Sequence, residues 1–173
     1  MNEQLNNKIH SGDRFIDIQN SAFESKNSTV ISFLNPFSYY EVVKEESLIS
    51  DVDIYFSDGA LLCILHNLFL PKITRASFDY SSIAEPFLQY VATKNKRIAI
   101  IGATTDENTL AVINLKKQFP NLNVVYQRDG YINDPDKTIN ELNLLKPDVV
   151  LVGMGTPYQE HFSIKVKHQL IKS

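Results

Sequence analysis

The sequence lacks tryptophan altogether and has one cysteine among its 173 residues. A single cysteine, Cys63, excludes an internal disulfide framework and a cysteine-based metal cluster. Cys63 lies in the longest apolar run, residues 60–70, so we expect a buried, unreactive thiol. That run is interrupted by His66 and Asn67 and is too short to span a bilayer. The first fifteen residues contain no apolar signal core, and these features together predict a cytoplasmic protein.

An excess of positive charge is also missing. Lysine and arginine number 17 against 20 aspartates and glutamates, which gives a net charge of −3. No basic stripe offers a footprint for a phosphate backbone, and we therefore expect no nucleic-acid partner.

Regular alternation of apolar segments dominates the rest of the chain. Continuously apolar strands separated by helical segments indicate βαβ units and a parallel sheet covered on both faces. We predict a single Rossmann-like α/β domain over residues 1–173, mostly parallel, after a polar N-terminal segment 1–27. The expected strands are 29–34, 53–57, 97–103, 123–127 and 148–154, with 73–78 a strand or an extended link. The expected helices are 38–50, 59–70, 81–93, 105–119 (with Leu110, Ile113 and Leu115 inward), 135–145 and 157–171.

Ligands of such sheets bind beyond the carboxyl ends of the strands. The polar and glycine residues that follow each predicted strand are therefore the candidates for a site, and we expect them to converge on one edge. They are Asn35, Asp58 with Gly59, Gly102 with Thr104 and Thr105, residues 128–131, and residues 153–160.

The stretch VVLVGMGTPYQEHF, residues 149–162, is the most informative of these. Thr156 suits an N-cap, Pro157 the first helical position, and Gln159 the third position of a capping box. Capping does not explain Gly153 and Gly155, which permit a tight turn and the close approach of another group. A helix start behind such a turn can also hold phosphate, and spacing alone leaves both interpretations open.

Five stretches taken together resemble one family. They are FLNP (33–36), FSDGALL (56–62), IAIIGA (98–103), FPNLNVVYQRDGYI (119–132) and KPDVVLVGMGTPYQEHF (146–162). In this order they are similar to motifs of the WecG/TagA/CpsF glycosyltransferases. The resemblance implies inverting transfer of N-acetylmannosamine, its uronic acid or a related hexose from a UDP-sugar to a polyprenyl-diphosphate-linked acceptor, in cell-surface polysaccharide or teichoic acid synthesis. It also implies a place at the inner face of a bacterial membrane, with no metal and no cofactor.

The resemblance assigns roles to particular residues. Asp58 matches the carboxylate proposed as catalytic base, although by position alone it also suits an N-cap for the helix at Gly59. Such a transfer needs a base for the acceptor hydroxyl and positive potential on the departing diphosphate. The expected substrate-binding residues are Asn35, Gly59, Arg75, Gly102, Gly130, Tyr131, Gly153, Gly155, Gln159 and Glu160.

Departures from the family pattern keep two alternatives open. Phe33 stands where a threonine is usual and Ser77 where a glycine is usual, while Tyr158 and Phe162 replace a common lysine and tryptophan. The usual C-terminal strand and basic tail do not follow, so the chain is either a shortened form or a naturally short member. A non-catalytic nucleotide-sugar-binding module is therefore the alternative, and an unrelated Rossmann-like nucleotide-binding protein is a weaker one.

The remaining charged patterns have ordinary structural explanations. The D-x-D patterns at Asp51 and Asp53 and at Asp134 and Asp136 could suggest a metal, but the former pair precedes a strand and the latter pair fits a helix cap. Basic residues on the last helix predict only weak, salt-sensitive attraction to a membrane surface, and homo-oligomer formation is left open. These basic residues are Lys165, Lys167, His168 and Lys172.

Overall fold

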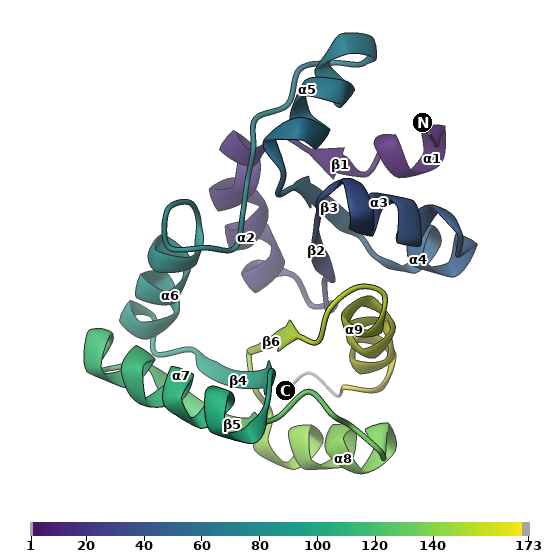
Figure 1. The fold of residues 1–173 in the computed structure, drawn as a ribbon. Helices are drawn as coiled ribbons and strands as arrows, with labels where there is room; N and C mark the ends of the chain where they lie inside the picture. Colours follow the sequence, from purple (N-terminus) through teal and green to yellow (C-terminus); the bar gives the residue numbers. More distant parts are fainter. Residues whose placement is uncertain (1, 171–173) are drawn as a thin grey trace. The chain divides into compact units, whose positions relative to one another are not determined.

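The computed structural model describes residues 2–170 of the chain (Figure 1). The chain divides into two compact units, residues 1–85 and 86–173. Each unit holds a three-stranded parallel sheet, which confirms the predicted α/β class and the parallel strand pairing. That the two units form one domain stays a prediction.

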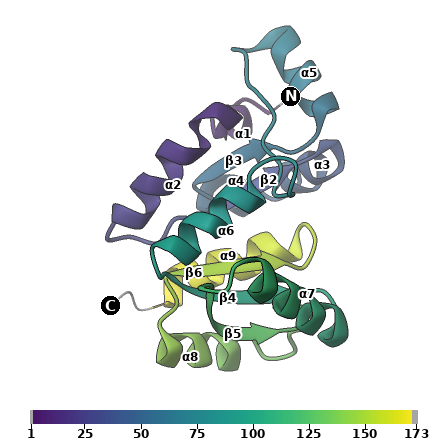
Figure 2. The same ribbon diagram turned by 90° about the vertical axis from the view of Figure 1, so that its left-hand side faces the viewer.

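The first unit is built on a sheet with the strand order β1-β3-β2. Ile31 to Leu34 pair in parallel with Ile54 to Ser57, so both of these strands end at the same edge. Figure 2 shows α2 on one side of this sheet and α3 with α4 on the other. The elements are α1 (Glu3–Asn6), β1 (Ile9–His10), η1 (Gly12–Arg14), α2 (Phe15–Glu24), β2 (Ile31–Leu34), α3 (Pro36–Val43), α4 (Glu46–Asp51), β3 (Ile54–Ser57) and α5 (Ala60–Phe69).

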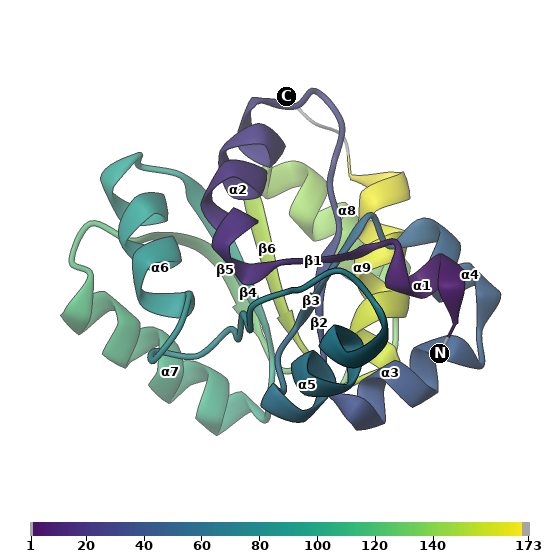
Figure 3. The same ribbon diagram turned by 90° about the horizontal axis from the view of Figure 1, so that it is seen from above.

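The second unit is built on a sheet with the order β5-β4-β6. Alternate residues of β4 are buried on opposite faces, as a sheet covered on both sides requires. Ala99 and Ile101 pack with α8 and α9, and α7 covers the other face (Figure 3). The elements are α6 (Ala84–Thr93, which crosses the boundary between the units), β4 (Arg97–Gly102), α7 (Thr105–Gln118), β5 (Asn123–Arg128), α8 (Pro135–Leu145), β6 (Val149–Gly153) and α9 (Tyr158–Gln169).

Several predicted elements need correction. Of the two alternatives for residues 73–78, the structure has the extended link, whereas the helix expected over 38–50 is two helices, α3 and α4. The segment 1–27, for which we predicted no element, contributes two helices and the edge strand β1. β1 is only two residues long, too short for any periodicity to reveal it.

The predicted inward face of α7 is wrong. Leu110 and Ile113 are exposed, whereas Asn108 and Val112 are buried. The capping box formed by Thr104 and Glu107 fixes where the helix begins. From that start Asn108 faces the strand end, where its amide donates to the carbonyl oxygen of Gly102 at 3.1 Å.

Candidate active site

Asp58 lies directly beyond the end of β3, beside the end of β2. Its backbone N–H donates to the carbonyl oxygen of Leu34 at 2.8 Å, which ties the two strand ends together. The N-cap of α5 is Gly59, in extended conformation and with no side-chain cap, so the interpretation of Asp58 as a helix cap is wrong. α5 begins at Ala60, one residue too late for Asp58 to be its N-cap. The Asp58 carboxylate is 38% exposed and is therefore available to a ligand.

Arg75 lies against Asp58 in this turn. Its Nε donates to the main-chain carbonyl of Asp58 at 2.5 Å, and its Nη2 lies 3.5 Å from Asp58 Oδ1. The Ala76 N–H donates to the Ser57 carbonyl at 2.9 Å, which holds the 73–76 link beside the end of β3. The resemblance assigned Arg75 and Asp58 to one site, and the structure brings these two residues together.

Asp79 fixes Arg75 from the other side. Its Oδ2 accepts from Arg75 Nη2 at 2.9 Å, and its Oδ1 accepts from the Ser81 hydroxyl at 2.6 Å. Hydrogen bonds from Ser81, then Ser77, then Arg75 lower the pKa of Asp79 to about 2. Ser77, a departure from the family pattern, thus supports the carboxylate that holds Arg75. Asp79 was not among the predicted site residues, although it lies in the same stretch as Arg75 and Ser77.

Gly12 was also missed, because it lies far away in the sequence. A Cβ at Gly12 would lie 2.4 Å from the carbonyl oxygen of Arg75. The Gly12 N–H donates to the Thr74 carbonyl at 3.0 Å. This glycine therefore permits the link that carries Arg75 to pass close by.

Asn35 follows β2 and caps α3. Its Oδ1 accepts from the Ser38 N–H at 2.9 Å, and the Ser38 hydroxyl accepts from the Asn35 N–H at 2.8 Å. This capping box accounts for Asn35 in the fold. Its exposed side chain lies next to Gly59, where an added Cβ would come within 3.7 Å of Asn35.

Two further departures from the family pattern, one in each unit, have packing roles, whereas Tyr158 is exposed. Phe33 stacks on Phe56, with ring centroids 5.8 Å apart, and lies 5.9 Å from Phe78. Phe162 is buried in the core of the second unit. Each of these rings therefore contributes to a core rather than replacing a polar contact.

Three glycines meet at the carboxyl end of the second sheet. Gly102 and Gly153 are partners across β4 and β6, and a Cβ at Gly102 would lie 2.3 Å from the Gly153 carbonyl oxygen. Gly102 also has a φ of +152°, which side chains rarely tolerate. A Cβ at Gly130 would lie 3.2 Å from the Gly102 Cα. These three predicted residues are thus brought together by close backbone packing.

Gly153 and Gly155, unlike Gly102 and Gly130, have open space where a side chain would be. A Cβ at either position would meet nothing within 4 Å, and Gly155 has a φ of +77°. The turn therefore needs a glycine at 155, whereas neither packing nor conformation explains the one at 153. Open space beside bare backbone is what the close approach of a ligand requires.

The predicted capping box at Thr156 is wrong. α9 begins at Tyr158, its N-cap is Pro157, and no side chain caps it. The Gln159 N–H donates to the Gly155 carbonyl at 3.0 Å, so it is not available to the Thr156 hydroxyl. That hydroxyl lies 3.3 Å from Glu160 Oε1 instead.

Glu160 is buried, with 1% of its surface exposed. Its Oε1 accepts from Gln159 Nε2 at 3.0 Å. The buried carboxylate thus accepts hydrogen bonds from both Thr156 and Gln159, while Gln159 itself is only partly buried. Of the two predicted residues, Gln159 is the one that can reach a ligand.

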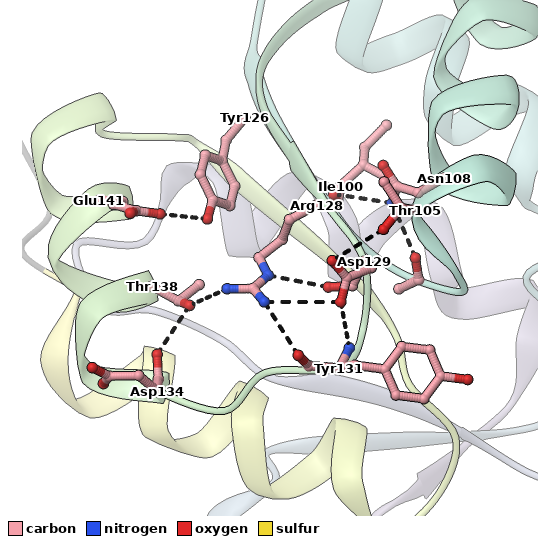
Figure 4. Close-up of polar contacts among 11 residues, drawn as sticks. Ile100, Thr105, Asn108, Tyr126, Arg128, Asp129, Tyr131, Asp134, Thr138 and Glu141 are labelled. Carbon is pink, nitrogen blue, oxygen red and sulfur yellow. Dashed lines mark hydrogen bonds and ion pairs between the residues drawn. The ribbon is translucent and has the colours of Figure 1, made fainter.

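Arg128, at the end of β5, organises the loop that carries Gly130 and Tyr131. It donates to the Thr138 hydroxyl at 2.7 Å and to the Asp129 carbonyl at 3.1 Å (Figure 4). Asp129 Oδ1 accepts from the Tyr131 N–H at 2.8 Å. The Tyr131 ring points away from this network and is 72% exposed.

The alternative metal and membrane features can also be located. Within residues 2–170, no three His, Cys, Asp or Glu side chains are grouped so that they could hold a metal ion. Asp134 caps α8 as predicted, and Lys165 pairs with Asp136 at 2.8 Å. Lys172 lies outside the described residues. In that same part of the chain, no helix has the length and apolar character needed to cross a bilayer.

Comparison with known proteins shows the family of this chain. A model of the glycosyl transferase WecG/TagA/CpsF family matches residues 4–173. The chain belongs to this family. It is 36% identical over 152 residues to a UDP-Gal:alpha-D-GlcNAc-diphosphoundecaprenol beta-1,4-galactosyltransferase of Shigella boydii, covering 86% of this chain and 64% of that protein.

More distant relatives carry a related name. The chain is 26% identical over 163 residues to an N-acetylglucosaminyldiphosphoundecaprenol N-acetyl-beta-D-mannosaminyltransferase of Bacillus subtilis, covering 92% of this chain and 63% of that protein. The chain therefore spans less than two thirds of the length of these relatives.

Proposed function

We propose that this member of the family catalyses inverting transfer of a hexose or N-acetylhexosamine from a UDP-sugar to a polyprenyl-diphosphate-linked acceptor. The observation that carries the proposal is Asp58, an exposed carboxylate at a strand end that caps no helix and lies beside an anchored arginine. The names of the relatives supply the substrate classes, a UDP-galactose donor in one case and diphosphoundecaprenol-linked acceptors in both.

In this proposal Asp58 is the general base. The acceptor hydroxyl oxygen attacks the anomeric carbon of the donor as its proton passes to the Asp58 carboxylate. The bond from that carbon to the diphosphate oxygen breaks, and UDP leaves with the electron pair. Arg75 is held by Asp79 and by the Asp58 carbonyl, so it keeps the loop and the carboxylate in place.

In the second unit, the turn between β6 and α9 has features that suit the binding of a diphosphate. α9 starts without a side-chain cap, directly after the open space at Gly153 and Gly155. Backbone N–H groups and the positive end of a helix stabilise such an anion as charge develops on it. The exposed Tyr131 ring offers a flat surface on which a uracil ring can stack. Gln159 supplies an amide for hydrogen bonds.

The reaction takes place, in this proposal, where the lipid-linked acceptor lies, at the inner face of the cell membrane. The chain binds there from the cytoplasm. Whether the sugar is galactose, N-acetylmannosamine or its uronic acid is the finer part of the proposal that the donor panel below decides.

The test is a donor panel in two stages. Calorimetric titration of the 173-residue chain with UDP, UDP-galactose, UDP-N-acetylglucosamine, UDP-N-acetylmannosamine and UDP-N-acetylmannosaminuronic acid is expected to show binding of UDP and, among the UDP-sugars, tightest binding of one. That donor is then incubated with N-acetylglucosaminyl-diphospho-undecaprenol, and the product is detected by mass spectrometry. Failure of every UDP compound to bind would overturn the proposal. Binding without transfer would favour the non-catalytic nucleotide-sugar-binding module.

A further inference from the structure

The outward face of α5 is apolar along its whole length. Five large side chains on it are between 41% and 78% exposed, and they recur at the spacing that normally marks the face of a helix turned to a core. These residues, called here the α5 face, are Leu61, Ile64, Leu65, Leu68 and Phe69.

The opposite side of α5 already serves the core of the unit. Leu62, Cys63 and His66 are buried there. A helix that is apolar on all sides is normally buried on all sides. Single exposed apolar residues are common on protein surfaces, but a continuous exposed apolar stripe is not. Residues 60–70 contain no Asp, Glu, Lys or Arg. The α5 face is therefore a surface built to be covered, with no charged side chain to be desolvated on contact.

Among residues 2–170, the exposed apolar residues of α7 and α8 do not form such a surface. On α7, Leu110 and Ile113 are exposed, but the same helix carries Asp106, Lys116 and Lys117 at its ends. Leu144 on α8 is exposed beside polar neighbours. Neither helix presents a stripe of five.

The position of α5 indicates what covers its face. The helix starts two residues after Asp58, and Figure 1 shows it at the extremity of the first unit, with the 70–83 connection leading away from it. In the proposed function the reacting hydroxyl is joined through a diphosphate to a polyprenyl chain, so the base must work at the level of the lipid headgroups. At a rise of about 1.5 Å per residue, the α5 face extends from the base for roughly 15 Å.

Aromatic and basic residues border this helix. An added Cβ at Gly59 would lie 3.3 Å from Pro36, so α3 and α5 begin side by side, and α3 exposes Phe37 and Tyr40. Aromatic rings at the edge of an apolar surface are typical of membrane interfaces. Lys72 is exposed just after α5, where it can meet an anionic headgroup.

The C-terminal end of α5 is held firmly. Asn67 accepts from the Ile73 N–H at 2.8 Å and donates to the Ile73 carbonyl at 3.0 Å. The α5 face is thus presented by an anchored helix.

We propose that the α5 face docks on the lipid surface that carries the acceptor. The inference rests on the proposed function for the choice of lipid as the occupant. It assigns membrane contact to apolar side chains of the first unit, whereas the sequence predicted only weak attraction through basic residues of the last helix.

The lack of tryptophan allows a direct test. Phe69→Trp places a single reporter on the α5 face, and Leu144→Trp is the matched control on α8. With phosphatidylcholine vesicles, the emission of the Phe69→Trp variant is expected to shift to the blue and to be quenched by brominated lipid. The Leu144→Trp emission is expected to stay unchanged. Because the contact is apolar, the shift should persist at high salt. Absence of the shift, or equal shifts in both variants, would overturn the proposal.

A pair of double variants tests the consequence for turnover. Ile64→Glu with Leu68→Glu is expected to lower vesicle binding at least tenfold, whereas Leu110→Glu with Ile113→Glu on α7 should leave it unchanged. With the identified donor, the α5 variant should lose turnover on the acceptor in vesicles and keep it on a short-chain, water-soluble analogue.

The outcomes separate the two proposals. Wild-type transfer without any vesicle contact by the α5 face would reject docking and leave the transferase intact. Vesicle contact without transfer on either acceptor would reject the transferase alone. Sedimentation velocity covers the other occupant: a wild-type dimer that the α5 variant converts to a monomer, with unchanged vesicle binding, would assign the face to a second copy of the chain.

Discussion

The turn between β3 and α5 differs from the turn between β6 and α9 in the chemical groups that it exposes. The first carries a carboxylate, Asp58, in contact with the guanidinium of Arg75. The second exposes backbone at Gly153 and Gly155 and turns its one carboxylate, Glu160, into the protein. The first turn thus offers an ionisable side chain that can accept a proton, and the second offers N–H groups and space.

The helices that follow these turns differ in the same way. α5 is apolar on both its faces, whereas α9 buries the charged Glu160 together with Phe162 and Val166, and its Lys165 pairs with Asp136 of α8. A strand followed by a helix therefore serves two purposes in this chain. Which purpose each one serves is decided by the few residues at the strand end, and substitutions there can break or sharpen the contrast.

The largest expected effect is on turnover, at the first turn. Asp58→Asn keeps the shape of the side chain but removes the base, so turnover should fall by about 10²–10⁴-fold. Donor affinity should stay close to that of the wild type, because the base acts on the acceptor proton. Steady-state rates and UDP titrations of both proteins check this. An Asn variant with wild-type turnover would remove Asp58 from the mechanism.

Replacing one glycine by alanine in each unit should lower the free energy of unfolding by different amounts. Gly102→Ala forces a Cβ to within 2.3 Å of the Gly153 carbonyl at a φ of +152°, and is expected to lower the free energy of unfolding by about 3 kcal/mol. Gly59→Ala meets Pro36 only at 3.3 Å, with a φ of −92°, and should cost about 1 kcal/mol. Urea unfolding curves compare them. Equal losses would show that the second sheet edge is not packed through its glycines.

A smaller effect is expected at Gly153. Alanine there meets no atom within 4 Å, so the free energy of unfolding should change by less than about 0.5 kcal/mol. If donor phosphate approaches this backbone, the Kd for UDP should rise about tenfold, equivalent to about 1.4 kcal/mol. Calorimetry with wild-type protein as the reference decides. Unchanged UDP affinity would move the donor away from this turn. Gly155 is unsuitable for the test because its φ of +77° would itself strain an alanine.

The smallest effect lies in the second unit, away from both turns. Burial and then the hydrogen bond to Glu141 at 2.6 Å raise the pKa of Tyr126 to about 12, from 10.0. Because the folded state holds this proton more tightly than the unfolded chain, the resulting stability is complete below about pH 10. It is lost as the pH rises from about 10 to about 12.

Tyr126→Phe should therefore reduce the loss of stability across that window, and Tyr158→Phe, at an exposed position, is the control. Thermal unfolding at a series of alkaline pH values measures it. If Tyr126→Phe loses stability with pH as steeply as the wild type, the phenol does not report on the packing of β5 against α8.

Much of this architecture was predictable because it depends on local patterns. Apolar runs separated by helical segments located five of the strands, and the cap at Asp134 was placed correctly. The edge strand β1 and the helix α2 were not, since a two-residue strand has no period and α2 follows it in a segment that reads as polar. The Thr156 cap failed because a backbone carbonyl, that of Gly155, satisfies the N–H that the cap would have taken.

The site itself was predictable only in part. The pattern of strand ends identified Asp58 and the glycines, because parallel strands bring their carboxyl ends to one edge of a sheet. The expected single edge was wrong, since the strands form two sheets and these residues are divided between them. The supports of Arg75 were not predicted: Asp79 contacts it from four residues further along the chain, and Gly12 lies against the Arg75 carbonyl from more than sixty residues away. No local pattern marks a residue such as Gly12. The α5 face was hidden for another reason, since an apolar stripe in a sequence normally predicts burial.

The anomeric configuration of the product tests the central claim most directly. If Asp58 acts as a base in a single displacement, a donor with an α-linked sugar, such as UDP-galactose, must give a β-linked product. NMR of the product formed with the donor identified above reads this from the one-bond coupling between the anomeric carbon and its proton, which differs between the two anomers for galactose and mannosamine alike. Inversion is the result that we predict. Retention would require a covalent sugar–enzyme intermediate or another route, and would contradict the role of Asp58 as the base.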